Sequence, residues 1–241
     1  MTMIATDLRA QLHTVRQAIA AACLQAARPA DAVQLLAVSK TQPPLALRAA
    51  FAAGQTDFGE NYVQEALDKM AALADLPLQW HCIGPLQSNK TKPVAEHFSW
   101  VHSVDRLKIA QRLSEQRPLH LPPLQICLQV NIDGGANKSG VEPAQAVDLA
   151  LAVVALPRLQ LRGIMSIPEP VEGFVAQKSV HLRSKRLFDD IAAALLSGHP
   201  AAARQFDTLS LGMSADMAAA IAAGSTMVRI GSAIFGARPA K

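Results

Sequence analysis

The sequence QLLAVSK, residues 34–40, is a short apolar run that ends in a lysine, and TQP follows it at residues 41–43. The apolar run is typical of a buried strand, and the proline ends it because proline has no backbone N–H to donate to a sheet. Residues 44–53 then predict a helix, with Pro44 near its start and Gly54 just past its end. One strand followed by one helix is the unit with which we compare the rest of the sequence.

The same unit recurs along the whole sequence. Strands are predicted at residues 35–40, 56–59, 78–83, 100–103, 124–132, 159–167, 208–211 and 227–230. Helical patterns lie between them, among them residues 105–116, where Asp105 can cap the helix, and roughly residues 182–196. One more helix is predicted in front, at residues 6–27, and a short tail follows the last strand. The alternation predicts an α/β fold, a single (β/α)8 barrel of the TIM type with an extra N-terminal helix, as one domain over residues 1–241. An open doubly wound sheet is the alternative, but its GxGxxG turn is absent after the first strand.

Composition narrows the classes of partner. Half of the residues are apolar and the formal charge is +4, but basic residues are scattered and only 4% are aromatic, so a nucleic-acid surface is not indicated. Cys23, Cys82 and Cys127 are widely spaced, which favours neither a disulfide framework nor a zinc site. Because no segment resembles a signal peptide or a membrane span, we expect a soluble cytoplasmic protein without a membrane partner.

Functional groups of a closed barrel lie at the carboxyl ends of its strands, and Lys40 stands at the end of the first. Burial lowers the pKa of a lysine and frees its amine for Schiff-base formation. Strands seven and eight lead into Gly212-Met213-Ser214 and Gly231-Ser232, where phosphate commonly binds in barrels. Taken singly, each turn is better explained as a helix cap or a tight turn. Together with an aldehyde-trapping lysine, they point to pyridoxal 5'-phosphate (PLP).

Other polar side chains at strand ends have more than one interpretation. Arg229 is expected to point into the barrel, where it needs an acceptor: a pyridine nitrogen, or an acidic residue such as Asp216. Facing a pyridine nitrogen, it would keep that nitrogen unprotonated and make the ring a weak electron sink. Asn61 either hydrogen-bonds the phenolic oxygen of the cofactor or caps a helix. His81 is more commonly a core residue than a catalytic one, and Lys138 is either solvated or gates the ligand.

Six stretches of the chain resemble the pyridoxal phosphate homeostasis protein family, the YggS type, almost from end to end. They are LAVSKT (36–41), FGENYVQE (58–65), WHCIGPLQSNK (80–90), HSVD (102–105), LGMSADM (211–217) and GSTMVRIGSAIFG (224–236). Several are too long and specific to agree by chance.

The resemblance implies a barrel related to the N-terminal domain of alanine racemase, a fold-type III PLP barrel, with Lys40 as the internal aldimine. The resemblance also implies that Ser214, Gly231 and Ser232 hold the phosphate and that Arg229 contacts the pyridine nitrogen. The implied role is to hold and deliver PLP within the cell, with apo-enzymes that use PLP as transient partners.

The choice between an enzyme and a carrier depends on a second acid/base. Racemases of this fold supply a tyrosine from a separate β-domain, whereas the only tyrosine here is Tyr62, and we expect no room for that domain before Lys241. We therefore expect a carrier without strong catalysis, and a monomer, since the racemase dimer contacts involve the missing domain. The alternatives are a PLP-dependent amino-acid racemase or lyase, and a barrel that holds another phosphorylated ligand through Lys40.

Overall fold

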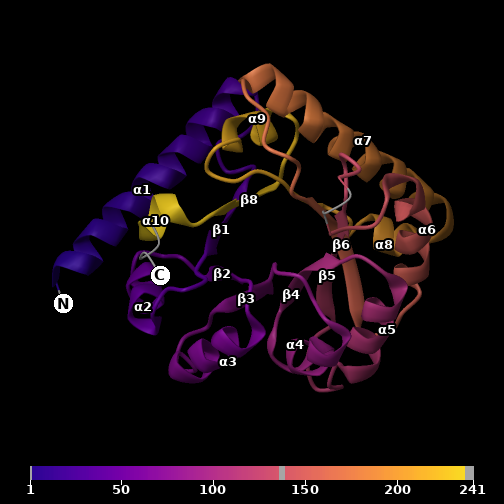
Figure 1. Cartoon of the computed structure of the whole chain (residues 1–241), viewed down its shortest axis with the longest axis horizontal. Helices are drawn as coiled ribbons and strands as arrows, with labels where there is room; N and C mark the ends of the chain where they lie inside the picture. The colour runs from indigo at the N-terminus through magenta and orange to yellow at the C-terminus, as the bar shows by residue number, and fades with distance from the viewer. Residues whose placement is uncertain (1, 136–138, 237–241) are drawn as a thin grey trace.

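The computed structural model describes residues 2–135 and 139–236, so Lys138 lies outside the described residues. Eight parallel strands form a closed barrel surrounded by helices (Figure 1). The strands are β1 (Gln34–Val38), β2 (Asp57–Glu60), β3 (Gln79–Cys82), β4 (Trp100–Val104), β5 (Leu124–Val130), β6 (Leu159–Ser166), β7 (Thr208–Ser210) and β8 (Met227–Ile230). Each strand pairs with the next, and β8 pairs with β1 to close the ring. The (β/α)8 fold expected from the sequence is confirmed.

Helices alternate with the strands on the outside of the barrel. They are α1 (Thr2–Gln25), α2 (Pro44–Ala52), α3 (Val63–Ala72), α4 (Thr91–His97), α5 (Leu107–Gln116), α6 (Pro143–Val154), α7 (Phe174–Gly198), α8 (Pro200–Ala203), α9 (Met217–Ala222) and α10 (Ser232–Phe235), with a 3-10 turn η1 (Ser88–Lys90) before α4. Within residues 2–135 and 139–236, no helix is long and apolar enough to cross a membrane.

Helix α1 covers the seam where β1 meets β8, because it packs against α2, α9 and α10, the helices that flank this pair (Figure 1). Its apolar face, including Leu12 and Ile19, is buried. Arg16 donates from Nη1 to the backbone oxygen of Ala53 (2.9 Å), just past α2. Arg28, beyond the end of α1, donates from Nη1 to the backbone oxygen of Ser225 (2.7 Å), just before β8. The extra helix therefore holds the first and last units of the barrel together.

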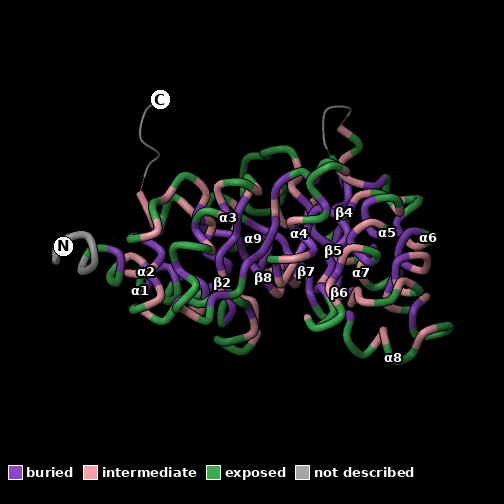
Figure 2. The backbone as a smooth tube through the Cα atoms, turned by 90° about the horizontal axis from the view of Figure 1, so that it is seen from below, coloured by how far each residue is buried: buried purple, intermediate pink, exposed green. Residues whose placement is uncertain are grey.

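The core has an apolar wall and a partly polar centre. Buried residues follow the strands and the inner faces of the helices, and exposed residues lie toward the periphery (Figure 2). Barrel interiors are usually filled by branched apolar side chains. Here the polar side chains of His81, His102, Ser210 and Arg229, from β3, β4, β7 and β8, are no more than 4% exposed and hydrogen-bond to one another in series. Their hydrogen bonds are described below with the site.

Two expectations about local structure are wrong. Asp105 does not cap α5, which begins at Leu107, because its carboxylate accepts a hydrogen bond from Nη1 of Arg106 instead (2.7 Å). Helix α7 begins at Phe174 rather than near residue 182, directly after Gly173, whose φ is +84°. Its first turn is exposed even where it is apolar, at Phe174 and Val175, so it lacks the buried apolar face from which we placed the helix.

A buried cluster of charged groups joins β1, β2 and α3. Lys69 is 3% exposed, and its Nζ donates to Oε1 of Glu60 (2.7 Å), Oε1 of Glu65 (2.6 Å) and the backbone oxygen of Ser39 (2.7 Å). Oγ of Ser39 donates to the same oxygen of Glu60 (2.6 Å). Burial raises the pKa of Glu60, and the hydrogen bonds from Lys69 and Ser39 oppose that rise. The cluster therefore fixes the carboxyl end of β1.

Lys69→Met should lower the free energy of unfolding by about 3–5 kcal/mol, because it leaves the carboxylate of Glu60 buried without a cation. The folded-state pKa of Glu60 then rises further above its unfolded value, and stability falls as pH increases between these two values. We expect a larger deficit at about pH 7.5 than at about pH 5 in urea unfolding. Adding Glu60→Gln should recover part of the loss, and Lys92→Met, at an exposed lysine, should change little. An equal deficit at both pH values, with no recovery, would contradict the assignment.

Candidate cofactor site

One cavity of about 290 Å³ opens at the carboxyl ends of β1, β7 and β8. Its size is near the lower end of small-molecule sites, roughly 300 Å³. Of the six residues predicted to bind the cofactor, five line it, namely Lys40, Ser214, Arg229, Gly231 and Ser232. The barrel brings them together because β1 and β8 are neighbours, although they lie at opposite ends of the sequence.

Lys40 lies in the turn directly after β1, two residues beyond the end of the strand at Val38. The next residue, Thr41, has a φ of +65°, a left-handed conformation that β-branched residues rarely adopt. Its N–H donates to Oε1 of Glu65 (2.5 Å), the oxygen that also accepts from Lys69. Such strain persists where the surroundings fix the backbone. The buried charge cluster thus sets the direction in which Lys40 leaves the strand.

The turn after β7 presents Ser214, which does not cap α9 as expected, because that helix begins three residues later at Met217. Gly212 has a φ of +89°, and a Cβ there would lie 2.6 Å from Cβ of Ala220, so the position requires glycine. Oδ1 of Asp216 accepts the N–H of Met213 (2.7 Å) and keeps the chain folded as a turn before the helix starts. Ser214 is exposed at the tip of this turn.

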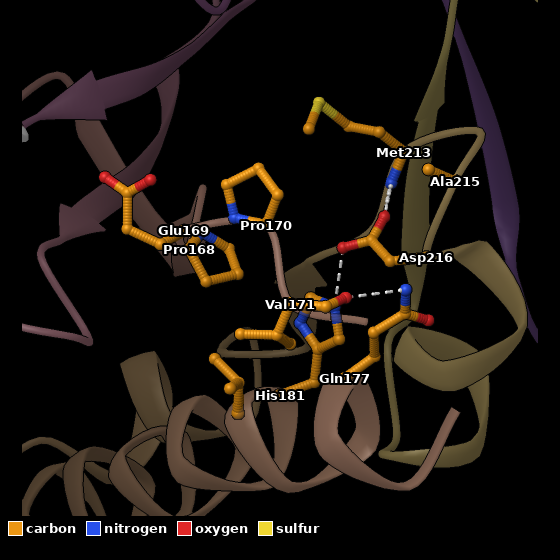
Figure 3. A pocket seen from close by; sticks show the side chains of 10 residues that line it. Pro168, Glu169, Pro170, Val171, Gln177, His181, Met213, Ala215 and Asp216 are labelled. Carbon is orange, nitrogen blue, oxygen red and sulfur yellow. Dashed lines mark hydrogen bonds and ion pairs between the residues drawn. The ribbon is translucent and has the colours of Figure 1, made fainter. Parts of the chain in front are cut away.

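A second cavity, of about 140 Å³, is also lined by this turn (Figure 3) and shares Met213 and Ala215 with the first. His181, on α7, donates from Nε2 to Oδ2 of Asp216 (2.8 Å) in this cavity (Figure 3). Burial alone would raise the pKa of Asp216, but its bonds with His181 and with the N–H of Met213 outweigh burial and lower it. Asp216 is therefore ionised at neutral pH and braces the turn that carries Ser214.

Gly231 and Ser232 form the wall contributed by the end of β8. A Cβ on Gly231 would lie 3.2 Å from the backbone oxygen of Val38 in β1, so a larger residue would press on the neighbouring strand. Ser232 is exposed and begins the four-residue helix α10, where the sequence predicted only a tail. Two serine hydroxyls, Ser214 and Ser232, therefore border the same cavity and can donate to an anion.

Arg229 is 4% exposed and reaches the cavity from the barrel interior. Nη1 donates to the backbone oxygen (2.6 Å) and Oγ (2.8 Å) of Ser210, and Nη2 donates to the backbone oxygen of Ser166 (2.9 Å). Burial lowers the pKa of Arg229 to about 10, so the guanidinium stays charged at neutral pH. The acidic partner considered above, Asp216, bonds to His181 instead. These three bonds use three of the five N–H groups of an arginine.

Asn61 is the predicted site residue that the cavity lining does not include. It follows β2 directly, so it lies at the same rim of the barrel as Lys40. It does not cap α3, whose N-cap is Tyr62. Its Oδ1 is buried and has no hydrogen-bond partner in the described part of the chain, which leaves a polar group available at the rim. A contact between Asn61 and the cofactor stays a prediction.

Sequence reasoning missed the residues that support the site. The spacing of Glu65 and Lys69, four apart on one helix, predicts an ion pair, but it does not reveal that both bond to the end of β1. The pairing of His181 with Asp216 joins residues 35 positions apart, for which no local pattern exists. The cavity offers one amine, two hydroxyls and one guanidinium, which fit an aldehyde, a phosphate and a ring nitrogen.

Comparisons with known proteins agree with this fold. The family model "Alanine racemase, N-terminal domain" matches residues 14–239. A pyridoxal phosphate homeostasis protein of Pseudomonas aeruginosa is 56% identical over 238 residues, 99% of this chain and 97% of that protein. The solved structure of PipY from Synechococcus elongatus PCC7942, with PLP bound, is 34% identical, with a TM-score of 0.79 over 95% of this chain and 100% of PipY.

A more distant likeness concerns the fold alone. Alanine racemase from Corynebacterium glutamicum is 16% identical, and its structure matches 98% of this chain with a TM-score of 0.65. The match covers 61% of the racemase. From the family model and the 56% identity over nearly the full length, we conclude that this chain belongs to the pyridoxal phosphate homeostasis protein family.

Proposed function

We propose that this protein binds PLP through a Schiff base on Lys40 and acts in intracellular PLP homeostasis and delivery. The observation that carries the proposal is the cavity that joins the Lys40 amine to Ser214, Ser232 and Arg229. The bound PLP of PipY, which shares the fold and 34% of the sequence, supports it. When bound, PLP supplies an aldehyde that reacts with amines. Lys40 would hold this aldehyde through its Nζ amine, with the aldehyde oxygen leaving as water.

Around that bond, each polar residue of the cavity has its own task. Ser214 and Ser232 donate hydrogen bonds to the phosphate, and Gly231 keeps space for it beside β1. Arg229 directs its remaining N–H groups toward the ring nitrogen from the barrel centre. Asn61 holds the phenolic oxygen at the rim. Together, these contacts orient a phosphorylated aldehyde relative to Lys40.

We propose a carrier rather than an enzyme with strong catalysis. Among the described residues that line the cavity, Lys40 and Arg229 are the only ones that titrate, so no second acid/base stands opposite the lysine. A charged Arg229 keeps the ring nitrogen unprotonated, which weakens the ring as an electron sink. Apo-enzymes that need PLP are then the transient partners, in the cytoplasm, and the carrier works as a monomer.

Lys40→Ala should abolish covalent capture of PLP. We expect wild-type protein incubated with PLP to show a visible absorbance band, and borohydride followed by peptide mass spectrometry to place a pyridoxyl group on Lys40. Lys92→Ala, which removes an exposed lysine, serves as the matched control and should behave like wild type. A band of full strength in Lys40→Ala, or a colourless wild-type protein, would refute the assignment of the lysine.

Ser214→Ala and Ser232→Ala should each weaken PLP binding by about tenfold, because each removes a hydrogen bond to a charged phosphate. Binding of pyridoxal, which has no phosphate, should not change. Spectroscopic titrations with the two aldehydes separate these cases. Equal losses for pyridoxal and PLP would show that the serines support the fold of the turns rather than the phosphate.

A protein loaded with PLP should activate an apo-enzyme that uses PLP while turning over no amino acid itself. Activation measured against free PLP at the same concentration gives the rate of delivery, and chiral chromatography of alanine, serine and other amino acids tests for racemisation. Sustained racemase or lyase turnover by the pure protein would favour the enzyme alternative. Activation no faster than release of PLP into solution would limit the role to storage.

A further inference from the structure

A row of hydrogen-bonded side chains crosses the interior of the barrel. Oγ of Ser210 lies 3.2 Å from Nδ1 of His102, and Nε2 of His102 lies 3.0 Å from Nδ1 of His81. Nε2 of His81 lies 3.2 Å from Oδ1 of Asp57, the first residue of β2. At the other end, Nη1 of Arg229 is 2.8 Å from Oγ of Ser210. Because β4 and β7 are not neighbours, the contact between His102 and Ser210 must run through the barrel centre.

The chemistry of the two ends fixes the direction of every bond. Arg229 can only donate, so Oγ of Ser210 accepts from it and can donate its own hydrogen to Nδ1 of His102. His102 then donates from Nε2 to His81, and His81 donates from Nε2 to Asp57. In the reverse direction, the lone pair of His81 Nε2 would face the carboxylate of Asp57. Because burial lowers the pKa of both imidazoles, both are neutral at pH 7 with their hydrogen on Nε2, and the row runs from a cation to an anion.

The charged groups around the two histidines agree with this state. Asp57 faces His81 from β2, and Arg229 faces the pair from β8. Burial lowers the pKa of His102 most, and the nearby His81 and Arg229 lower it further. Burial lowers the pKa of His81, and Asp57 opposes that change. Trp100 stacks on His81 at 5.2 Å between ring centroids, and Arg162, from β6, lies 5.0 Å above the Trp100 ring.

Asp57, at the end of the row, is held by several hydrogen bonds. Burial alone would raise the pKa of Asp57, but hydrogen bonds from His81, Thr56 and Gln34 lower it. Its side chain is 16% exposed, and it lies at the amino end of β2, the face of the barrel opposite the cavity. The row therefore links a carboxylate on one face of the barrel to the guanidinium that lines the cofactor cavity on the other.

We propose that Asp57, His81, His102 and Ser210 are positioning residues that hold Arg229 against the bound cofactor and transmit the charge of Asp57 to it. This inference rests on the proposed function, because it assigns Arg229 to the ring of PLP. The guanidinium has no ion-pair partner among the described residues, and its hydrogen bonds go to two backbone oxygens and one hydroxyl. The charge of Asp216 acts on Arg229 from the turn after β7 without a hydrogen bond, and the row adds the charge of Asp57, so the state of the row sets how strongly Arg229 acts on the ligand.

A double-substitution cycle tests the transmission. Asp57→Asn removes the charge and keeps an oxygen that accepts from His81, whereas Ser210→Ala removes the link to Arg229. Each should lower the midpoint of the pH titration of the visible PLP band by about half a pH unit, because a less compensated guanidinium disfavours a proton on the bound ligand. In the Ser210→Ala background, Asp57→Asn should add no further shift.

The control is Asp207→Asn, a carboxylate just before β7 that pairs with Arg162 outside the row. We expect no shift from it. If Asp57→Asn shifts the midpoint equally in both backgrounds, its charge acts through space and the proposal is wrong. Unfolding midpoints of all variants show whether a loss of binding is a loss of fold.

A second measurement does not require PLP. Nitrogen-15 shifts of His81 and His102 in the ligand-free protein should show neutral rings with hydrogen on Nε2 between about pH 7 and 8. Ser210→Ala should change the shift of Nδ1 in His102 and leave His81 bonded to Asp57. A cationic ring near neutral pH, or hydrogen on Nδ1, would overturn the row itself. If PLP fails to bind while the tautomers are as stated, the proposed function is wrong and so is the role of the row toward the ring.

Discussion

The pairing of β8 with β1 is the constraint on which the site depends. Lys40 leaves β1 and Gly231 leaves β8, and nearly 200 residues of sequence separate them. Closure places both at one rim, where a Cβ on Gly231 would press on Val38. Helix α1 reinforces this seam, because Arg16 and Arg28 bond to backbone oxygens on either side of it. The helix in front of the barrel thus contributes to the geometry of the cavity without reaching it.

The barrel centre is polar where apolar packing would be the simpler way to stabilise it. Each buried polar group costs free energy unless its hydrogen bonds are made. In the row from Arg229 to Asp57 every member has a partner at both ends, so the cost is offset, and the side chains have a single orientation. A branched apolar core would pack as well, but it would remove the hydroxyl that Arg229 bonds to and leave the guanidinium with its two backbone partners alone. The polar centre is therefore better explained by the site than by stability.

Local patterns in the sequence were sufficient for the strands, for Lys40 and for the two small-residue turns after β7 and β8. Each of these follows from hydrophobic runs and from glycine or proline within a few residues. Long-range pairings were not predictable in this way. In the sequence, Lys69 looks like an exposed helical lysine, but its Nζ bonds to the backbone oxygen of Ser39 just after β1. His102 bonds to Ser210, which lies 108 positions away in the sequence. Asp216, which the sequence left as the alternative acceptor for Arg229, braces its own turn because α7 brings His181 to it.

The two ends of the site differ in how firmly they are held, and this difference fits a protein that must give up its ligand. Arg229 and the row behind it are almost fully buried and hydrogen-bonded, so the end proposed to hold the ring has a rigid centre. Ser214 and Ser232 are exposed, on a turn and at the start of a four-residue helix, so the end proposed to hold the phosphate is open to solvent. An enzyme with strong catalysis gains from enclosing its reacting groups. A carrier gains from an aldehyde that is oriented for capture by Lys40 and a phosphate that another protein can reach.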